Sequence, residues 1–454
     1  MNKLLAIALC SVCCGNSAAQ SSYTLEQILD SARQNNIAIR SARYSVDAAS
    51  QQRKEAFTKY FPGISATGLW FNANKGMAQT TLNPSEMMSP EVGAALAQSL
   101  PAEALAALAT PVSISMMKNG TLAGLTAVQP VFAGGRIVNG NRLAKVGEDV
   151  SRLQLRLSEN EVEKTAEQYY WQIVSLQEKM KTVGAVEAML ADIHKDVDVA
   201  VRAGVALHND LLQVRLRQNE VESQKLKLKN GLGIVRLLLA QYCGLRDTSF
   251  VIAHPAFNID GSPAPAGGEA NHVQSPTFSV ESLPEYQLLG KQVEASRLQK
   301  NLAVGQNLPS VAVGAGYNYH NLLDRDHAFG MVYATVSVPI SDWWGGSHSI
   351  RRKKIEYQKA VDEQQDKAQL LQIRMQKAWD DVVEGRQQLS IAWRSIQQAS
   401  ENLRLHRDYY RAGTCRMSDL LEAQMLYQQS CDKYTDAYAV LQNSILEYRQ
   451  ATGQ

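Results

Sequence analysis

Small and apolar residues in the second half of the chain recur in alternating steps of four and three positions. Residues 371–403 keep this pattern without a break, and residues 420–448 resume it. The first half repeats it over residues 143–157 and 211–242. A period of 3.5 residues is typical of helices that pack along one another as coiled coils. The pattern therefore predicts long packed helices in both halves.

Two of these helices are predicted to be unusually long. They span about residues 141–201 and 347–411, which gives each a length of ~90–100 Å. Small or polar residues interrupt their apolar lines and those of the neighbouring helices, among them Gly385, Gln218 and Lys225. A dry two-stranded coil tolerates few such residues, whereas helices around a water-filled lumen need only narrow contacts. We therefore expect the helices to surround an aqueous channel.

A second pattern, the alternation of apolar residues with polar or small ones, marks four short segments. It is clear over residues 311–319 and 330–338 and weaker over 64–74 and 121–131. Each segment is predicted to be a strand of ~10 residues with one apolar face, which is long enough to cross a bilayer. No apolar run after Gln20 would suffice for a membrane-spanning helix, so a crossing would use strands. Because an open sheet edge in lipid leaves backbone groups unpaired, several chains are expected to contribute four strands each to one closed barrel.

Aromatic residues gather at both ends of the predicted strands. In a membrane protein they would lie at the two lipid–water interfaces, whereas in a soluble sheet they would belong to the core. The strands alone leave both interpretations open. One group consists of Trp70, Phe71, Tyr317, Tyr319 and Phe329, and the other of Phe61, Phe132, Trp343 and Trp344.

The chain contains an internal repeat, which is clearest at a motif of three residues. The motif is Arg202, Ala203 and Gly204 in the first half and, 209 positions later, Arg411, Ala412 and Gly413 in the second. Each copy is followed by an Asp-Leu-Leu triplet at the start of a predicted helix. A reversal between two helices requires a positive φ angle, which glycine adopts without steric penalty. Both glycines are therefore predicted to form tight turns between helices.

Prolines at the expected corners between strands and helices repeat as well. They are Pro62 and Pro130 in the first copy and Pro309 and Pro339 in the second. The duplication predicts structural repeats over residues 20–245 and 284–454, joined by a segment at 246–283 that is rich in Pro, Gly and Ser. The first copy has an insertion at about 76–120, which is expected to project outside the cell and to form two short helices.

The N-terminus has the features of a secretory signal peptide. Lys3 precedes an apolar run, and Ser17, Ala18 and Ala19 follow in the small-residue pattern that signal peptidase recognises. Residues 1–19 are therefore expected to be removed when the protein is exported.

Composition and motifs give no support to an enzyme or to a nucleic-acid-binding protein. The net charge is +2 with both signs intermixed, so no basic stripe is present. Cys243, Cys415 and Cys431 follow the predicted signal peptide, and their odd number argues against a disulfide framework. His320 and His327 fall in a predicted loop, where we interpret them as solvated polar residues rather than a metal site. No catalytic residue and no cofactor is predicted.

Taken in order, the motifs of this chain resemble those of the TolC-like outer-membrane factors of Gram-negative bacteria. They comprise the segment that begins at Tyr23, the segments around the corners at Pro130 and Pro339, and the two Ala-Gly turns. The resemblance implies an α+β membrane protein and a homotrimer. Four strands per chain would form a twelve-stranded β-barrel in the lipid of the outer membrane. A long α-helical coiled-coil barrel would continue it into the periplasm.

The resemblance also implies a passive exit duct for small molecules such as drugs and toxic compounds. A periplasmic adaptor protein would dock at the two turns and connect the duct to an inner-membrane pump that supplies the energy. Two other functions stay open: the outer-membrane component of a type I protein secretion system, and a soluble periplasmic coiled-coil scaffold. The cargo is not identified, because a wide aqueous tunnel has no tight pocket.

In that family the turns form a tip that closes the tunnel at rest, so polar residues beside them are gate candidates. These are Asn209, Asp210, Tyr410, Asp419 and Glu422. Under threefold symmetry, each carboxylate would become part of a ring that favours cations.

Helix capping is the alternative role for several of these residues. Asn209, Asp210, Ser418 and Asp419 have side chains that often cap helix N-termini, whereas Glu422 lies too far into its helix to do so.

A lock for the closed tip is also implied by the resemblance, because the family often places an arginine shortly after the second turn. Cys415 stands near that position here, and Arg416 is shifted by one residue. Arg411 is the candidate that would take its place.

Overall fold

The computed structural model describes residues 22–76, 78–83, 88–99, 101, 103–104, 106, 110–253, 279–322, 326–340 and 342–453. The predicted signal peptide and most of the expected segment between the repeats lie outside these residues. The chain divides into two compact units, each described by itself below. The helical unit comprises Met1–Ser50, Gly147–Glu294 and Lys359–Gln454, and the sheet unit comprises Gln51–Val146 and Ala295–Gln358.

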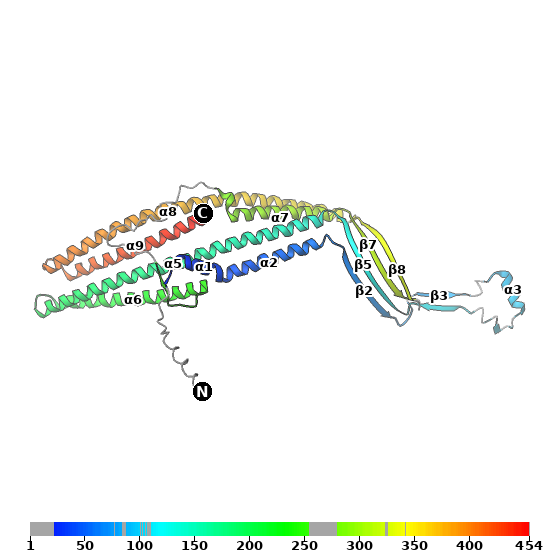
Figure 1. Cartoon of the computed structure of the whole chain (residues 1–454), viewed down its shortest axis with the longest axis horizontal. Coiled ribbons are helices and arrows are strands. Elements are labelled where there is room, and N and C mark those ends of the chain that lie inside the picture. Colours follow the sequence, from blue (N-terminus) through cyan, green and yellow to red (C-terminus); the bar gives the residue numbers. More distant parts are fainter. Residues whose placement is uncertain are drawn as a thin grey trace, which may run out of the picture. The chain divides into compact units, whose positions relative to one another are not determined.

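The sheet unit is built on one antiparallel sheet of four strands (Figure 1). The strands are β2 (Gly63–Asn72), β5 (Asn119–Ala133), β7 (Ser310–Asn321) and β8 (Asp326–Ser337), in the order β2-β5-β7-β8. All four predicted strands are confirmed, with somewhat different ends. β2 and β8 form the two edges, so each has one side without a strand partner in the described part of the chain.

One face of this sheet is apolar across all four strands. The register places Ala66 beside Leu125, Leu125 beside Tyr317, and Ala315 beside Val332. The sequence alternation assigns Ala315, Tyr317 and Val332 to the apolar face, and the register places Ala66 and Leu125 on the same face. Val332 is 86% exposed in the single chain. A continuous apolar surface of this kind marks a face that is covered by lipid or by another protein.

The opposite face has several small residues, which make room for larger side chains. A Cβ atom on Gly124 would lie 2.5 Å from Oδ1 of Asn318, and one on Gly314 would lie 2.4 Å from the ring of Tyr333. Glycine at these two positions is therefore required by packing, although both have ordinary strand backbone conformations.

His320 and His327 lie on this second face, as direct partners on the neighbouring strands β7 and β8. The prediction that they belong to a loop is therefore wrong. Both strands are longer than the segments that the apolar alternation identified. The alternation missed their ends because these carry polar residues such as Asn321 and Asp326. Alternation marks the apolar part of a strand, while backbone pairing extends further.

Three of the four predicted corner prolines lie at strand ends: Pro62, Pro309 and Pro339. Pro130 instead lies inside β5, where the pairing with β7 shifts its register. Proline has no N–H group to donate to the ladder, so it fits at such an irregularity. The chain turns after the end of β5 instead, at Gly134 and Gly135, whose φ angles are +60° and +74°.

Between β2 and β5 the chain forms a hairpin and a short helix. The elements are β3 (Ala78–Leu82), α3 (Pro90–Ser99) and β4 (Val112–Met116), with β3 paired to β4. Of the two short helices expected here, α3 is described, and several residues after it lie outside the described part. The sequence does not predict the hairpin, because its strands are too short to establish an alternation.

The helical unit contains the long helices that the apolar period predicts (Figure 1). Some helices continue into the sheet unit. The helices are α1 (Leu25–Asn35), α2 (Ile37–Thr58), α5 (Arg136–Arg202), α6 (His208–Cys243), α7 (Pro284–Gln306), α8 (Asp342–Arg411) and α9 (Met417–Thr452). A parallel pair of two-residue strands, β1 (Ser22–Tyr23) and β6 (Val251–Ile252), and a 3₁₀ turn, η2 (Val280–Ser282), complete the unit. Among the residues described, no helix has both the length and the apolar character required to span a membrane.

The apolar line predicted for α8 and α9 is buried along most of its length. Met375 and Val382 on α8 and Leu441 and Tyr448 on α9 are each at most 1% exposed and belong to one core cluster. Gly385, which interrupts the line in the sequence, has a packing role here. A Cβ atom on it would lie 3.2 Å from a methyl carbon of Leu441, so the small residue lets the two helices approach closely.

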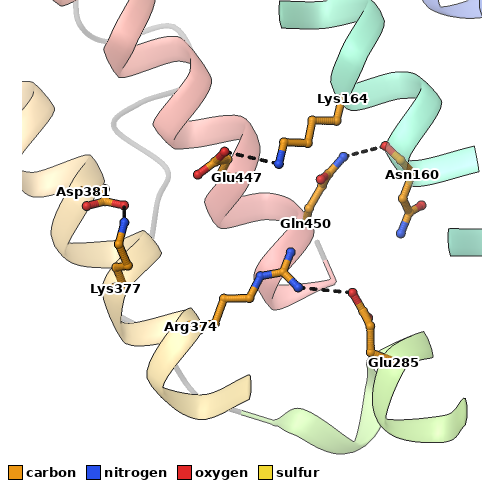
Figure 2. A network of polar contacts seen from close by, with 8 residues as sticks. All are labelled: Asn160, Lys164, Glu285, Arg374, Lys377, Asp381, Glu447 and Gln450. Atoms are coloured by element: carbon orange, nitrogen blue, oxygen red, sulfur yellow. Dashed lines mark hydrogen bonds and ion pairs between the residues drawn. The ribbon is translucent and has the colours of Figure 1, made fainter. Parts of the chain in front are cut away.

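Polar contacts connect four helices near the C-terminal end of α9 (Figure 2). Lys164 of α5 pairs with Glu447 of α9 at 3.3 Å, and Gln450 donates to a backbone carbonyl of α5 at 2.7 Å. Arg374 of α8 lies 3.5 Å from Glu285 at the start of α7. Because these charged partners are partly exposed, each pair stabilises the fold only slightly, and the apolar core holds the helices together.

Candidate functional site

The two Ala-Gly turns lie at the same end of the helical unit, where α5 meets α6 and α8 meets α9 (Figure 1). Gly204 and Gly413 have φ angles of +74° and +72°, which confirms the predicted positive values. The amides of Val205 and Thr414 donate to carbonyl oxygens in the preceding helical turn, at 3.0 and 2.9 Å. A Cβ atom on either glycine would meet no other group within 4 Å, so only the backbone conformation requires glycine. The neighbouring side chains Arg202, Ala203, Arg411 and Ala412 are exposed.

The helices after the two turns begin differently. Oδ2 of Asp419 accepts the backbone N–H of Arg416 at 3.2 Å, and the hydroxyl of Ser418 donates to Oδ1 of Asp419 at 3.1 Å. Helix capping is therefore one role of Asp419. At the start of α6 no side chain makes a capping hydrogen bond, while Asn209 is exposed and Asp210 is half-buried. Capping thus does not account for Asp210.

Asp210 and Tyr410 come from different hairpins, and Asp210 lies near enough for its charge to act on the Tyr410 hydroxyl. Burial raises the pKa of the Tyr410 hydroxyl, and the negative charge of Asp210 raises it further. Tyr410 also packs against a core cluster that draws on all four helices of the two hairpins. Tyr410 therefore lies at the junction between the hairpins, within reach of the charge of Asp210.

The predicted substitutes for a locking arginine are not engaged in the structure. Neither Arg411 nor Arg416 makes an ion pair within the described part of the chain, and both are exposed. Cys415 is half-buried, and its thiol donates to the carbonyl of His406 at 3.4 Å. Burial raises the pKa of this thiol, and Asp419 raises it further. Cys415 thus does not supply the positive charge that a locking arginine would.

Glu422 is exposed on α9, three residues after the half-buried Asp419. Two carboxylates three positions apart share one side of a helix. Within the described residues Glu422 has no ion-pair partner, so its charge is free to act on the surrounding solvent.

A largely buried polar cluster joins α6 to α9 further from the tip. Nε of Arg217 donates to Oε1 of Gln424 at 3.0 Å, and its Nη2 donates to Oε1 of Gln428 at 2.8 Å. Nε2 of Gln428 in turn donates to Oε1 of Gln224 at 2.8 Å. Gln424 is fully buried, and Gln428 and Arg217 are 4% and 8% exposed. We call these four residues the α6–α9 polar cluster.

The α6–α9 polar cluster fixes the relative position of the two hairpins. Apolar contacts allow a helix to slide, whereas a guanidinium with two buried amide acceptors has one favourable arrangement. Nη1 of Arg217 also reaches the largely exposed Glu220 at 2.9 Å. The sequence carries one signal for this cluster, because Arg217 lies in the apolar period between Val214 and Val221. The partners could not be predicted, since they are more than 200 positions away.

Residues 287–454 match the family model described as outer membrane efflux protein. None of the curated proteins matches the chain in sequence.

Several solved structures share the fold over nearly the whole chain. The outer membrane protein VceC from Vibrio cholerae is 14% identical, with a TM-score of 0.72, and the match covers 94% of this chain and 96% of that one. The CmeC outer membrane channel of Campylobacter jejuni is 16% identical, with a TM-score of 0.73 and coverages of 94% and 85%. The MtrE outer membrane channel of Neisseria gonorrhoeae is 14% identical, with a TM-score of 0.69 and coverages of 94% and 88%.

The family match and the fold agree with each other and with the motifs of the sequence. The match falls on α7, β7, β8, α8 and α9, which include the second Ala-Gly turn. The resemblance predicted from the sequence is thereby confirmed: residues 287–454 match the outer membrane efflux protein model, and the chain has the fold of outer-membrane channels of known structure.

Proposed function

We propose that this protein is the outer-membrane channel of a tripartite efflux system, a passive exit duct for small molecules such as drugs and toxic compounds. A periplasmic adaptor would bind its tip, and an inner-membrane pump would drive the cargo into it. One observation carries the proposal: the four-stranded sheet has a continuous apolar face and two edge strands that lack a further partner among the described residues. The efflux-protein domain in the same chain supports it.

The unpaired edges favour an assembly of several chains. In lipid, the free N–H and C=O groups of β2 and β8 would each cost several kcal/mol. Pairing β8 of one copy with β2 of the next satisfies both edges. We propose three copies, which give a closed barrel of twelve strands in the outer membrane. Exposed aromatic residues near the strand ends, such as Trp70 and Tyr317, fit the lipid–water interface.

The long helices would continue this barrel into the periplasm. α5 and α8 contain 67 and 70 residues, so each would be about 100 Å long. We retain the proposed repeats over residues 20–245 and 284–454, the connection at 246–283 and an extracellular insertion at about 76–120. The exit duct would then run through both parts of the trimer.

The tip would contain both the docking site and the gate. The exposed Arg202, Ala203, Arg411 and Ala412 beside Gly204 and Gly413 are available to the helices of an adaptor. Asp210 and Tyr410 lie where the hairpins of one chain meet, so a movement between the hairpins would separate them. Asn209, Asp419 and Glu422 complete the proposed gate, in which the carboxylates would favour cations.

Cross-linking in intact cells tests the docking site. A cysteine is introduced by Ala412→Cys in a Cys415→Ser background, because Ala412 is exposed whereas the thiol of Cys415 is half-buried with a raised pKa. Ser400→Cys in the same background is the control, since Ser400 is exposed on α8 about 18 Å away along the helix. A short bifunctional thiol reagent should link an adaptor to Ala412→Cys and not to Ser400→Cys.

The captured protein decides between the functions. An adaptor of a proton-driven multidrug pump supports efflux, whereas an adaptor of an ATP-driven protein exporter would assign the duct to type I secretion. Failure to capture an adaptor at an accessible Ala412→Cys thiol would contradict docking at the turns. Release of the protein by osmotic shock, without detergent, would instead favour a soluble scaffold and overturn the membrane assignment.

A further inference from the structure

His320 and His327 form a close pair that the proposed duct does not explain. They are direct cross-strand partners on β7 and β8, so their side chains leave the sheet on the same face. Their ring centroids are 5.2 Å apart, and the ring planes are almost perpendicular, at 89°. The ring of Phe329 lies 6.2 Å from His320 and 5.8 Å from His327, centroid to centroid.

This spacing suits two imidazoles that share one metal ion. With metal–nitrogen bonds of about 2.0–2.1 Å and a tetrahedral angle, two such rings have centres about 5 Å apart. The Nδ1 atom of His320 is inaccessible to solvent and has no hydrogen-bond partner in the described part of the chain. A buried ring nitrogen without a partner is unfavourable, and a bound ion would satisfy it.

The carboxylate of Asp326, the neighbour of His327 along the chain, is held away from the pair. Asp326 precedes His327 in the strand and therefore points to the opposite face. Its Oδ1 accepts the hydroxyl of Tyr319 at 2.7 Å and the amide of Asn321 at 2.9 Å. No cluster of three or more His, Cys, Asp or Glu side chains suited to a metal occurs among the described residues. The pair would thus supply two nitrogen ligands, with water completing the coordination.

We propose that His320 and His327 bind one divalent late transition-metal ion per chain, Cu²⁺ more tightly than Zn²⁺. Imidazole ligands suit these ions, and Cu²⁺ precedes Zn²⁺ in the general order of affinity. Ca²⁺ and Mg²⁺ require oxygen ligands and would not bind. Both ligands belong to one chain, so the site is independent of the proposed trimer and of the proposed efflux function. A bound ion would link β7 to β8 at the end of their hairpin.

Metal titration of the purified full-length protein tests this site. The protein is prepared in detergent without a polyhistidine tag, and Cu²⁺ or Zn²⁺ is added at neutral pH in a calorimeter. The wild type should bind one ion per chain. His327→Gln should lower the Cu²⁺ affinity by more than about tenfold, since even second-shell changes cost about 10–100-fold.

Two controls separate the pair from other histidines and from misfolding. His348→Gln removes an exposed histidine on α8 and should leave the affinity unchanged. His327→Cys keeps a metal ligand at the same exposed position and should restore Zn²⁺ binding. The electron paramagnetic resonance spectrum of bound Cu²⁺ should show nitrogen couplings from two imidazoles in the wild type. In His327→Gln it should show couplings from only one imidazole. Absence of binding in the wild type, or equal affinity in His327→Gln, would overturn the proposal.

Discussion

Exchanging Arg217 for methionine measures how strongly the α6–α9 polar cluster joins the two hairpins. Methionine retains an apolar stem in the buried position but lacks the guanidinium. The buried amide oxygens of Gln424 and Gln428 then lose their donors. Leaving a buried acceptor unpaired costs about 1–3 kcal/mol. We therefore expect the local opening free energy of α6 and α9 to fall by about 3 kcal/mol, with only a minor contribution from the exposed Glu220.

Amide hydrogen exchange followed by mass spectrometry provides the assay, because it reports local opening without reversible unfolding of a membrane protein. A loss of about 3 kcal/mol corresponds to roughly 100-fold faster exchange. The effect should be confined to peptides from residues 211–221 and 420–431. Lys225→Met is the control on the same helix, since it removes an ion pair with Glu187 in which both side chains are about half exposed. It should cost at most about 1 kcal/mol, or roughly fivefold in exchange.

A triple variant, Arg217→Met with Gln424→Leu and Gln428→Leu, tests whether unpaired acceptors cause the faster exchange. Replacing Arg217 and its two buried acceptors with apolar side chains removes the unpaired acceptors together with the charge, so much of the protection should return. If Arg217→Met exchanges no faster than Lys225→Met, the cluster does not hold the hairpins together. If the triple variant is as labile as the single one, unpaired acceptors are not the cause.

Further predictions concern the tip. Gly413→Ala should lower the free energy of unfolding by about 1–2 kcal/mol, because residue 413 has a positive φ angle, and Gly413→Asn should lower it by less. Calorimetry in which both variants match the wild type would contradict this. Asp419→Asn with Glu422→Gln should reduce cation selectivity in planar bilayers, and unchanged currents would make these carboxylates ordinary surface groups. Cys415 should alkylate more slowly at pH 8 than a free thiol because its pKa is raised, and Asp419→Asn, which removes one cause, should accelerate it. Cys243 should stay unlabelled in the native protein, since burial raises the pKa of its thiol to about 12.

Features that depend on neighbours along the chain are readable from the sequence. The apolar period identified the buried line of α8 and α9, because helix geometry repeats regularly. The close approach of the two helices at Gly385 was not predicted, since it depends on Leu441 of the other helix. The alternation predicted β7 and β8 with their apolar face, and the internal repeat supported the weaker alternation of β2 and β5. The glycines of the two turns were predictable as well, since a positive φ angle is a local property of the backbone.

Other features depend on which distant segments meet, and only the tertiary structure decided them. His320 and His327 became a pair through the register of β7 and β8, which the alternation of each strand alone does not reveal. Pro130, which the sequence placed at a corner, lies inside β5 because the pairing with β7 continues past it. Arg217 looks like an interruption of a helix seam until Gln424 and Gln428 are placed beside it by packing between hairpins. Local periodicity thus determines the elements and their faces, whereas the polar contacts that join those elements are set by the folded arrangement, because each requires a partner that the local sequence does not contain.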